Sequence, residues 1–153
     1  MNNKDLIEFV LFHERDIRRA VYEKQEDGCL PKTGGGSSGH CRISDTTAQN
    51  AIRHVMGVGS VVVEYGAATC GKRNSITIRH PEKWIQTISG VKQILTGRPA
   101  GTLLKLRYSD NLTPPEICDA MHINKPRYYA LKADVLLAAE SYAAGLGLLN
   151  TRH

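Results

Sequence analysis

The sequence has no apolar run long enough to cross a bilayer, and it opens with the polar residues MNNKD. A membrane-spanning helix needs about 18 or more apolar residues in succession, and a secretory signal begins with a basic and then an apolar stretch. The pattern therefore predicts neither insertion nor secretion, and we expect a cytoplasmic protein without a membrane partner. The 4 cysteines include no C-x-x-C pair, which favours reduced thiols in that compartment.

Familiar metal and catalytic arrangements are missing as well. The sequence suggests neither a nucleophile, base and acid triad nor a pair of carboxylates for acid/base catalysis. A zinc site can be drawn only from residues whose spacing matches no common zinc module: Cys29, His40, Cys41, Cys70 and His80. We therefore expect no metal, no cofactor and no enzymatic activity.

The stretch LPKTGGGSSGHCRISD, residues 30–45, has the glycine- and serine-rich composition of a flexible linker or exposed loop. A glycine loop that opens a helix can also cradle phosphate. In a Walker loop, however, lysine and then serine or threonine follow the last glycine, whereas Lys32 precedes the glycines here. A nucleotide-binding enzyme that uses Gly34–Gly36 is therefore the less favoured alternative.

The chain has 153 residues and a net charge of +5 at pH 7. This length allows one ordinary domain or two small ones. The surplus of lysine and arginine lies after residue 45. A basic balance leads us to expect a polyanion such as nucleic acid as partner, although many ordinary proteins are equally basic.

Hydrophobic periodicity predicts a mainly α-helical fold. Leu6, Val10, His13 and Ile17 recur at helical spacing within residues 4–26, as in an amphipathic helix. Such a helix can pack on its own domain or pair with a second copy. The expected regions are 1–29, the N-terminal helix; 30–45, the linker; 46–97, a helix, a β-hairpin and a helix from Pro81; and 98–153, a helix-turn-helix DNA-binding domain.

The runs SVVVEY, residues 60–65, and SITIR, residues 75–79, are rich in β-branched side chains. The segment GAATCGKRN separates them, which is typical of a hairpin. The hairpin tip would carry Lys72 and Arg73, which are candidate contacts to DNA phosphates. A solvated loop is the competing interpretation.

Two N-cap signatures predict two helices in the last region. Thr113 is followed by Pro114 and, at capping-box spacing, by Glu116, and this helix should end near Met121. Asn124 is the second N-cap. Helices joined by about three residues form a helix-turn-helix, and the residues expected to be buried between them are Ile117, Met121, Ile123, Tyr128 and Leu131. His122 takes the turn position where glycine is common, which a residue that tolerates positive φ can occupy.

The second helix would present cations to a DNA groove. With Tyr128 and Leu131 facing inward, the outward residues are Lys125, Pro126, Arg127, Tyr129, Ala130 and Lys132. Arg127 could bind the O6 and N7 atoms of guanine, Lys125 could do the same or hold phosphate, and the Tyr129 ring could contact a thymine methyl group. A solvated basic face on a purely structural helix pair is the competing interpretation.

Phosphate contacts are expected around this reading surface. The helix starts at Thr113 and Asn124 present backbone amides that can bind phosphate oxygens. Lys132, a turn beyond the reading residues, is a further candidate phosphate contact. The apolar surplus after Lys132 suggests self-association, which would present two such helices to two half-sites.

Two family resemblances support these expectations. The run LLKLRYSDNLTPPEICDAMHINKPRYYALKADVL, residues 103–136, resembles without gaps the C-terminal domain of bacterial sigma-70 factors that reads the −35 promoter element. That likeness implies a phosphate contact for Thr113. It also implies outward recognition-helix positions for Lys125, Pro126, Arg127, Tyr129 and Ala130. Because Pro126, Tyr129 and Ala130 differ from the usual sigma base readers, the −35 sequence preference does not transfer.

Over nearly the whole chain, the order of features resembles the RinA-type regulators of phages and prophages of Gram-positive bacteria. The residues that carry this likeness are GGGSSGHCRISDTTAQNAIR, PEKW and the terminal helix-turn-helix. The resemblance implies a transcriptional activator of late packaging and morphogenesis genes in the bacterial host cytoplasm, with promoter DNA as partner. Host RNA polymerase and a homodimer partner are further candidates. A small terminase subunit that recognises packaging-site DNA is the alternative.

Overall fold

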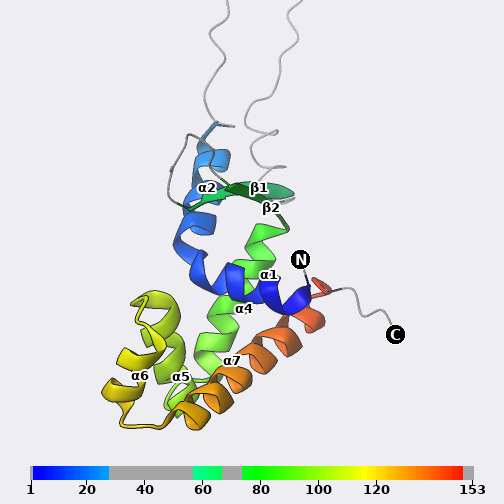
Figure 1. Ribbon diagram of the computed structural model, residues 1–153. Coiled ribbons are helices and arrows are strands. Elements are labelled where there is room, and N and C mark those ends of the chain that lie inside the picture. Colours follow the sequence, from blue (N-terminus) through cyan, green and yellow to red (C-terminus); the bar gives the residue numbers. More distant parts are fainter. Residues whose placement is uncertain (1, 28–56, 67–73, 150–153) are drawn as a thin grey trace, which may run out of the picture. The chain divides into compact units, whose positions relative to one another are not determined.

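The computed structural model describes residues 2–27, 57–66 and 74–149 (Figure 1). These residues form six α-helices, a short π-helix and one two-stranded antiparallel sheet, so the expected mainly α fold with a β-hairpin is confirmed at that level. The chain forms two compact units, one of Met1–Ile17 with Lys83–His153 and one of Arg18–Glu82. The expected linker and the helix predicted from residue 46 lie outside the described residues.

The hairpin of the Arg18–Glu82 unit agrees with the prediction. Strand β1 (Ser60–Tyr65) pairs with β2 (Asn74–Arg79), with Val61 opposite Ile78. Val61, Val63 and Ile78 are buried, because alternate side chains on a strand face the same side of the sheet. Lys24 Nζ donates to the Ser60 carbonyl oxygen at 2.6 Å, which ties the helix that contains Lys24 to strand β1.

The N-terminal segment differs from the prediction of one helix over residues 4–26. Helix α1 (Asn3–Phe12) and helix α2 (Glu14–Asp27) are separated at His13, which has φ −104° and ψ 24°. Its ring lies 4.3 Å from the Phe9 ring, and its Nδ1 atom lies 3.1 Å from the Asp16 carboxylate. No proline or glycine lies at this break, and the hydrophobic spacing continues across it, so the sequence did not indicate it.

The buried stripe of α1 is also displaced from the predicted one. Ile7, Val10 and Leu11 are buried, whereas Leu6, which the helical spacing placed in the core, is only half-buried. Ile17 is fully buried, as expected. Ile7, Val10 and Ile17 also keep helical spacing, so the observed stripe differs from the predicted one in burying Ile7 in place of Leu6.

Helix α4 (Pro81–Ile94) starts at the predicted proline. Trp84, Ile88, Val91 and Leu95 are buried, so Trp84 is a core residue and offers no surface for stacking of bases. A Cβ atom at Gly90 would lie 2.3 Å from Cζ of Tyr142, and one at Gly101 would lie 2.2 Å from the Leu95 carbonyl oxygen. Glycine at both positions therefore allows close approach of neighbouring backbone and side chains.

The helix that follows α4 changes its winding before it ends. Helix α5 (Pro99–Leu104) continues into a π-helix, η1 (Lys105–Ser109), in which the Asp110 N–H donates to the Lys105 carbonyl oxygen at 3.0 Å. Tyr108 of η1 is buried, and its ring meets Phe12 of α1 edge to face at 4.7 Å. The Arg107 guanidinium lies 4.9 Å from the centre of the same Phe12 ring.

Helix α6 (Pro114–Met121) and the long helix α7 (Lys125–Gly145) complete the larger unit. Helix α7 packs against α5, α1 and α6, and its buried residues are Tyr128, Leu131, Val135, Ala139 and Ala143 (Figure 1). Among the described segments, no helix combines the length and apolar character that crossing a bilayer requires.

Candidate nucleic-acid interface

The start of α6 is held by a capping box, as the sequence predicted. Thr113 has an extended backbone, φ −76° and ψ 157°. Its N–H and its hydroxyl donate to Oε2 of Glu116 at 2.7 and 2.6 Å. These hydrogen bonds from the Thr113 side chain and backbone lower the pKa of Glu116. A phosphate that approached the Thr113 amide would therefore meet a carboxylate already bound there.

The link between α6 and α7 consists of His122, Ile123 and Asn124. His122 is left-handed, with φ 52° and ψ 45°, which confirms that the turn position requires positive φ. The Ile123 N–H donates to the Cys118 carbonyl oxygen at 3.0 Å, which satisfies one of the last carbonyls of α6. The turn is thus closed by the backbone, although its residue is not glycine.

Helix α7 begins at the predicted cap. Oδ1 of Asn124 accepts a hydrogen bond from the Arg127 N–H at 3.0 Å. Pro126, inside the first turn, has no N–H to leave unsatisfied. The first turn of α7 is therefore fixed locally, before any packing is considered, and it sets the direction in which the Arg127 side chain leaves the helix.

The inward residues agree in part with the prediction. Ile117, Tyr128 and Leu131 are almost completely buried, with 0%, 1% and 3% exposure. Met121 and Ile123 are only half-buried. These two residues lie at the end of α6 and in the link, where fewer neighbouring elements cover them.

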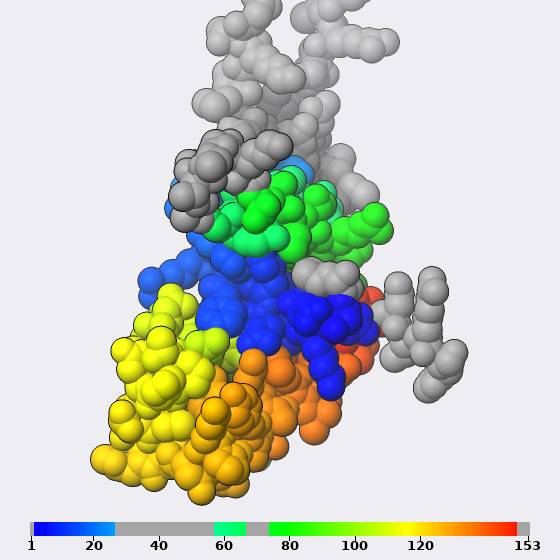
Figure 2. Space-filling model, viewed as in Figure 1, coloured from blue at the N-terminus to red at the C-terminus, as the bar shows by residue number. Residues whose placement is uncertain are grey.

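The predicted reading residues share the exposed side of the first turns of α7. We call this set the α7 reading face, and its members are Lys125, Pro126, Arg127, Tyr129 and Ala130, all exposed. Within residues 2–27, 57–66 and 74–149, the side chains of Lys125 and Arg127 have no hydrogen-bond or ion-pair partner. The Tyr129 ring is 53% exposed and lies edge to face on Tyr128 at 5.2 Å. Figure 2 shows α6 and these turns side by side on the surface.

Lys132, which the sequence predicted to be outward, is instead half-buried and paired with a carboxylate of another helix. Its Nζ atom lies 2.6 Å from Oε1 of Glu8 in α1, and the two side chains are only 24% and 29% exposed. Glu8 is the residue of this region that sequence reasoning missed. Glu8 and Lys132 lie near opposite ends of the sequence, and only the packing of α1 on α7 brings them together.

Several candidate residues lie outside the described part of the chain. These are Lys72 and Arg73 of the hairpin tip, Gly34–Gly36 of the nucleotide alternative, and Cys29, His40, Cys41 and Cys70 of the zinc alternative. The remaining zinc candidate, His80, is exposed. In the described segments, no three residues among histidine, cysteine, aspartate and glutamate gather as metal ligands would.

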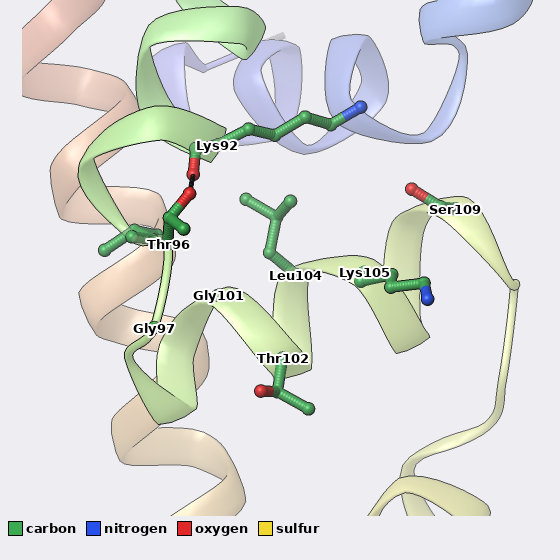
Figure 3. A pocket seen from close by; sticks show the side chains of 9 residues that line it. Lys92, Thr96, Gly97, Gly101, Thr102, Leu104, Lys105 and Ser109 are labelled. Atoms are coloured by element: carbon green, nitrogen blue, oxygen red, sulfur yellow. Dashed lines mark hydrogen bonds between the residues drawn. The ribbon is translucent and has the colours of Figure 1, made fainter.

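A pocket of about 560 Å³ lies between the end of α4 and the α5–η1 segment (Figure 3). Two of its polar side chains are engaged with other groups: Lys92 Nζ pairs with Glu14 at 2.5 Å, and the Thr96 hydroxyl donates to the Lys92 carbonyl oxygen at 2.7 Å. Leu95 and Leu104 supply its apolar lining. The pocket brings no set of polar groups to a common point, so we assign it no chemistry.

The chain matches none of the family models, curated proteins or solved structures with which it was compared.

Proposed function

We propose that the protein binds duplex DNA sequence-specifically through a helix-turn-helix made of α6, residues 122–124 and α7, and that it catalyses no reaction. The observation that carries the proposal is the α7 reading face. Two cations, Lys125 and Arg127, are exposed and lack partners in the described residues. Tyr128, the next residue after Arg127, is buried and anchors the opposite side of the helix. A helix anchored on one side with free cations on the other fits a helix that enters the major groove.

In this proposal the residues of the α7 reading face have different tasks. Arg127 binds the O6 and N7 atoms of a guanine, which needs a planar group with two parallel donors. The Tyr129 ring and the Ala130 methyl group contact apolar base edges such as the thymine methyl. Lys125 reads a base or holds a phosphate, and the helix start at Asn124 faces the backbone. At Thr113 a phosphate contact requires that the Glu116 carboxylate give up the Thr113 N–H or hydroxyl.

Within this function we propose a transcriptional activator of late packaging and morphogenesis genes in a bacteriophage or prophage. The support is the resemblance of the sequence to RinA-type regulators and to the −35-reading domain of sigma-70 factors. Promoter DNA is then the primary partner. Host RNA polymerase and a second copy of the chain are further partners under the same proposal.

Selection of bound sequences from random duplex DNA tests the reading function most directly. Arg127→Ala should reduce affinity for the selected site by ~1–3 kcal/mol and relax the choice at one base pair. Arg15→Ala is the matched control, because it removes an exposed arginine from α2, outside the α7 reading face. Equal losses for both variants, or no selected sequence at all, would contradict the proposal.

A small terminase subunit is the second candidate, favoured by one observation. Leu137 of α7 is 63% exposed and would be covered in an oligomer, although a single exposed leucine is ordinary on a monomeric surface. Terminase function predicts a ring of many copies, whereas the activator predicts a monomer or dimer that shifts a promoter fragment. Measurement of the mass of the assembly in solution decides between them.

A further inference from the structure

Lys125 and Lys132 lie on the same side of α7. They are seven residues apart, which is almost two full turns of an α-helix, so their side chains leave the helix in nearly the same direction. Lys125 is exposed and has no partner in the described residues. Lys132 is paired with Glu8 at 2.6 Å. Lys125 and Lys132 could both reach phosphates along one side of α7, but helix α1 places the Glu8 carboxylate against Lys132.

A second polar group beside this ion pair is left without a partner. The Tyr108 hydroxyl is buried, and the structure gives it no hydrogen bond within the described segments. Glu8 and Phe12 are one turn apart on the same side of α1, and the Phe12 ring meets the Tyr108 ring edge to face at 4.7 Å, so α1 brings Glu8 to the neighbourhood of Tyr108. In agreement with this placement, burial and then the charge of Glu8 raise the pKa of Tyr108. A buried donor without an acceptor is costly, and a nearby carboxylate is the acceptor that it lacks.

We propose that Glu8 competes with DNA phosphate for Lys132, so that α1 tunes the affinity of α7 for DNA. This inference rests on the proposed DNA-binding function. In the free protein, Glu8 holds Lys132. On DNA, Lys132 turns to a phosphate, and Glu8 accepts the hydrogen bond of the Tyr108 hydroxyl instead. The exchange leaves neither the carboxylate nor the hydroxyl unpaired, so releasing Lys132 costs little.

The chain contains a matched control for this inference. Glu14, near the start of α2, forms a comparable ion pair with Lys92 at 2.5 Å, away from the α7 reading face. Glu8→Gln and Glu14→Gln each remove one negative charge from the same unit. A general effect of net charge on DNA affinity would be the same in both variants, whereas release of Lys132 would appear in Glu8→Gln alone.

The experiment measures affinity for one duplex, at several salt concentrations, for the full-length chain and its variants. We expect Glu8→Gln to bind about two- to fivefold more tightly than Glu14→Gln, the range expected for a partly exposed ion pair. Adding Lys132→Gln should abolish this gain and reduce the salt slope by about one. Tyr108→Phe should weaken binding when Glu8 is present and leave the Glu8→Gln variant unaffected.

Equal affinities for Glu8→Gln and Glu14→Gln would overturn the competition while leaving the proposed function intact, provided that Arg127→Ala still weakens binding. A wild-type chain that binds no duplex DNA would overturn both. Thermal unfolding monitors whether each variant folds. Glu8→Asp, which keeps the charge but shortens its reach to Lys132, serves as a second variant and should show a smaller gain in affinity.

Discussion

Asn124 and Arg127 are joined by a hydrogen bond from the Arg127 N–H to Oδ1 of Asn124, 3.0 Å long. This bond links the residue that ends the turn to the residue proposed to read a base. The cap fixes the φ and ψ angles of the first turn, and with them the direction of the Arg127 side chain. Local backbone chemistry and the proposed recognition of DNA therefore depend on the same contact.

Asn124→Ala is expected to destabilise the fold by about 1 kcal/mol, the usual effect of losing an N-cap side chain. It should also weaken binding of the selected DNA site, because the first turn of α7 loses its anchor. Chemical denaturation and DNA titration measure the two effects. Asn124→Asp keeps the cap acceptor, so it should retain stability while adding a negative charge beside the DNA. Loss of stability in both variants would argue against the capping role.

His122→Gly is expected to stabilise the fold by roughly 0.5–1 kcal/mol, because His122 has φ 52° and glycine adopts this conformation without a steric penalty. Ala120→Gly, two residues earlier on the exposed side of α6, is the control. There the same new residue should destabilise the helix by about 1 kcal/mol. The midpoints of denaturant unfolding compare the two variants. A destabilised His122→Gly protein would mean that the imidazole makes contacts that outweigh the backbone strain.

Gly90→Ala is expected to destabilise the fold by ~1–3 kcal/mol, because the new Cβ atom would overlap the Tyr142 ring. Tyr142→Ala in the same chain should relieve the overlap, so that Gly90→Ala becomes harmless in that background. A double-mutant cycle of unfolding free energies measures this dependence. Additive effects of the two substitutions would show that α4 and α7 do not meet at these residues.

Glu116 predicts a dependence of stability on pH. Its pKa is lowered in the folded protein by hydrogen bonds from the Thr113 side chain and backbone, relative to an ordinary value of 4.5. The carboxylate therefore contributes stability that is fully present above pH 4.5 and is lost as the pH falls through the lowered value. Unfolding midpoints between neutral and acidic pH should fall less steeply for Glu116→Gln than for the wild type. Identical profiles would contradict the capping box.

Lys72→Ala and Arg73→Ala test the hairpin tip, which the sequence alone suggests as a phosphate contact. Each change should weaken binding of all duplexes about equally and reduce the salt slope by about one. Arg127→Ala, by contrast, should weaken the selected site more than unrelated DNA. Salt titrations with a selected and a scrambled duplex separate the two behaviours. If both variants bind DNA as the wild type does, Lys72 and Arg73 belong to a solvated loop that does not contact DNA.

The residues that start helices could be recognised from the sequence. Thr113, Asn124 and Pro81 start helices where their chemistry predicts, because caps and first-turn prolines act through neighbouring atoms. The β-branched runs in residues 60–65 and 75–79 also predicted both strands. The turn at His13 and the π-helix at Lys105–Ser109 escaped prediction, since neither involves proline or an unusual periodicity.

The sequence by itself determined where α6 and α7 begin and which side of α7 is buried, since caps and apolar spacing act over a few residues. Tertiary structure alone decided that Lys132 faces Glu8 and that Tyr108 lies buried beside them. Those contacts join residues far apart in the chain, and side-chain packing between α1, η1 and α7 selects them. No local pattern carries that information, because each of these residues would suit an exposed position equally well.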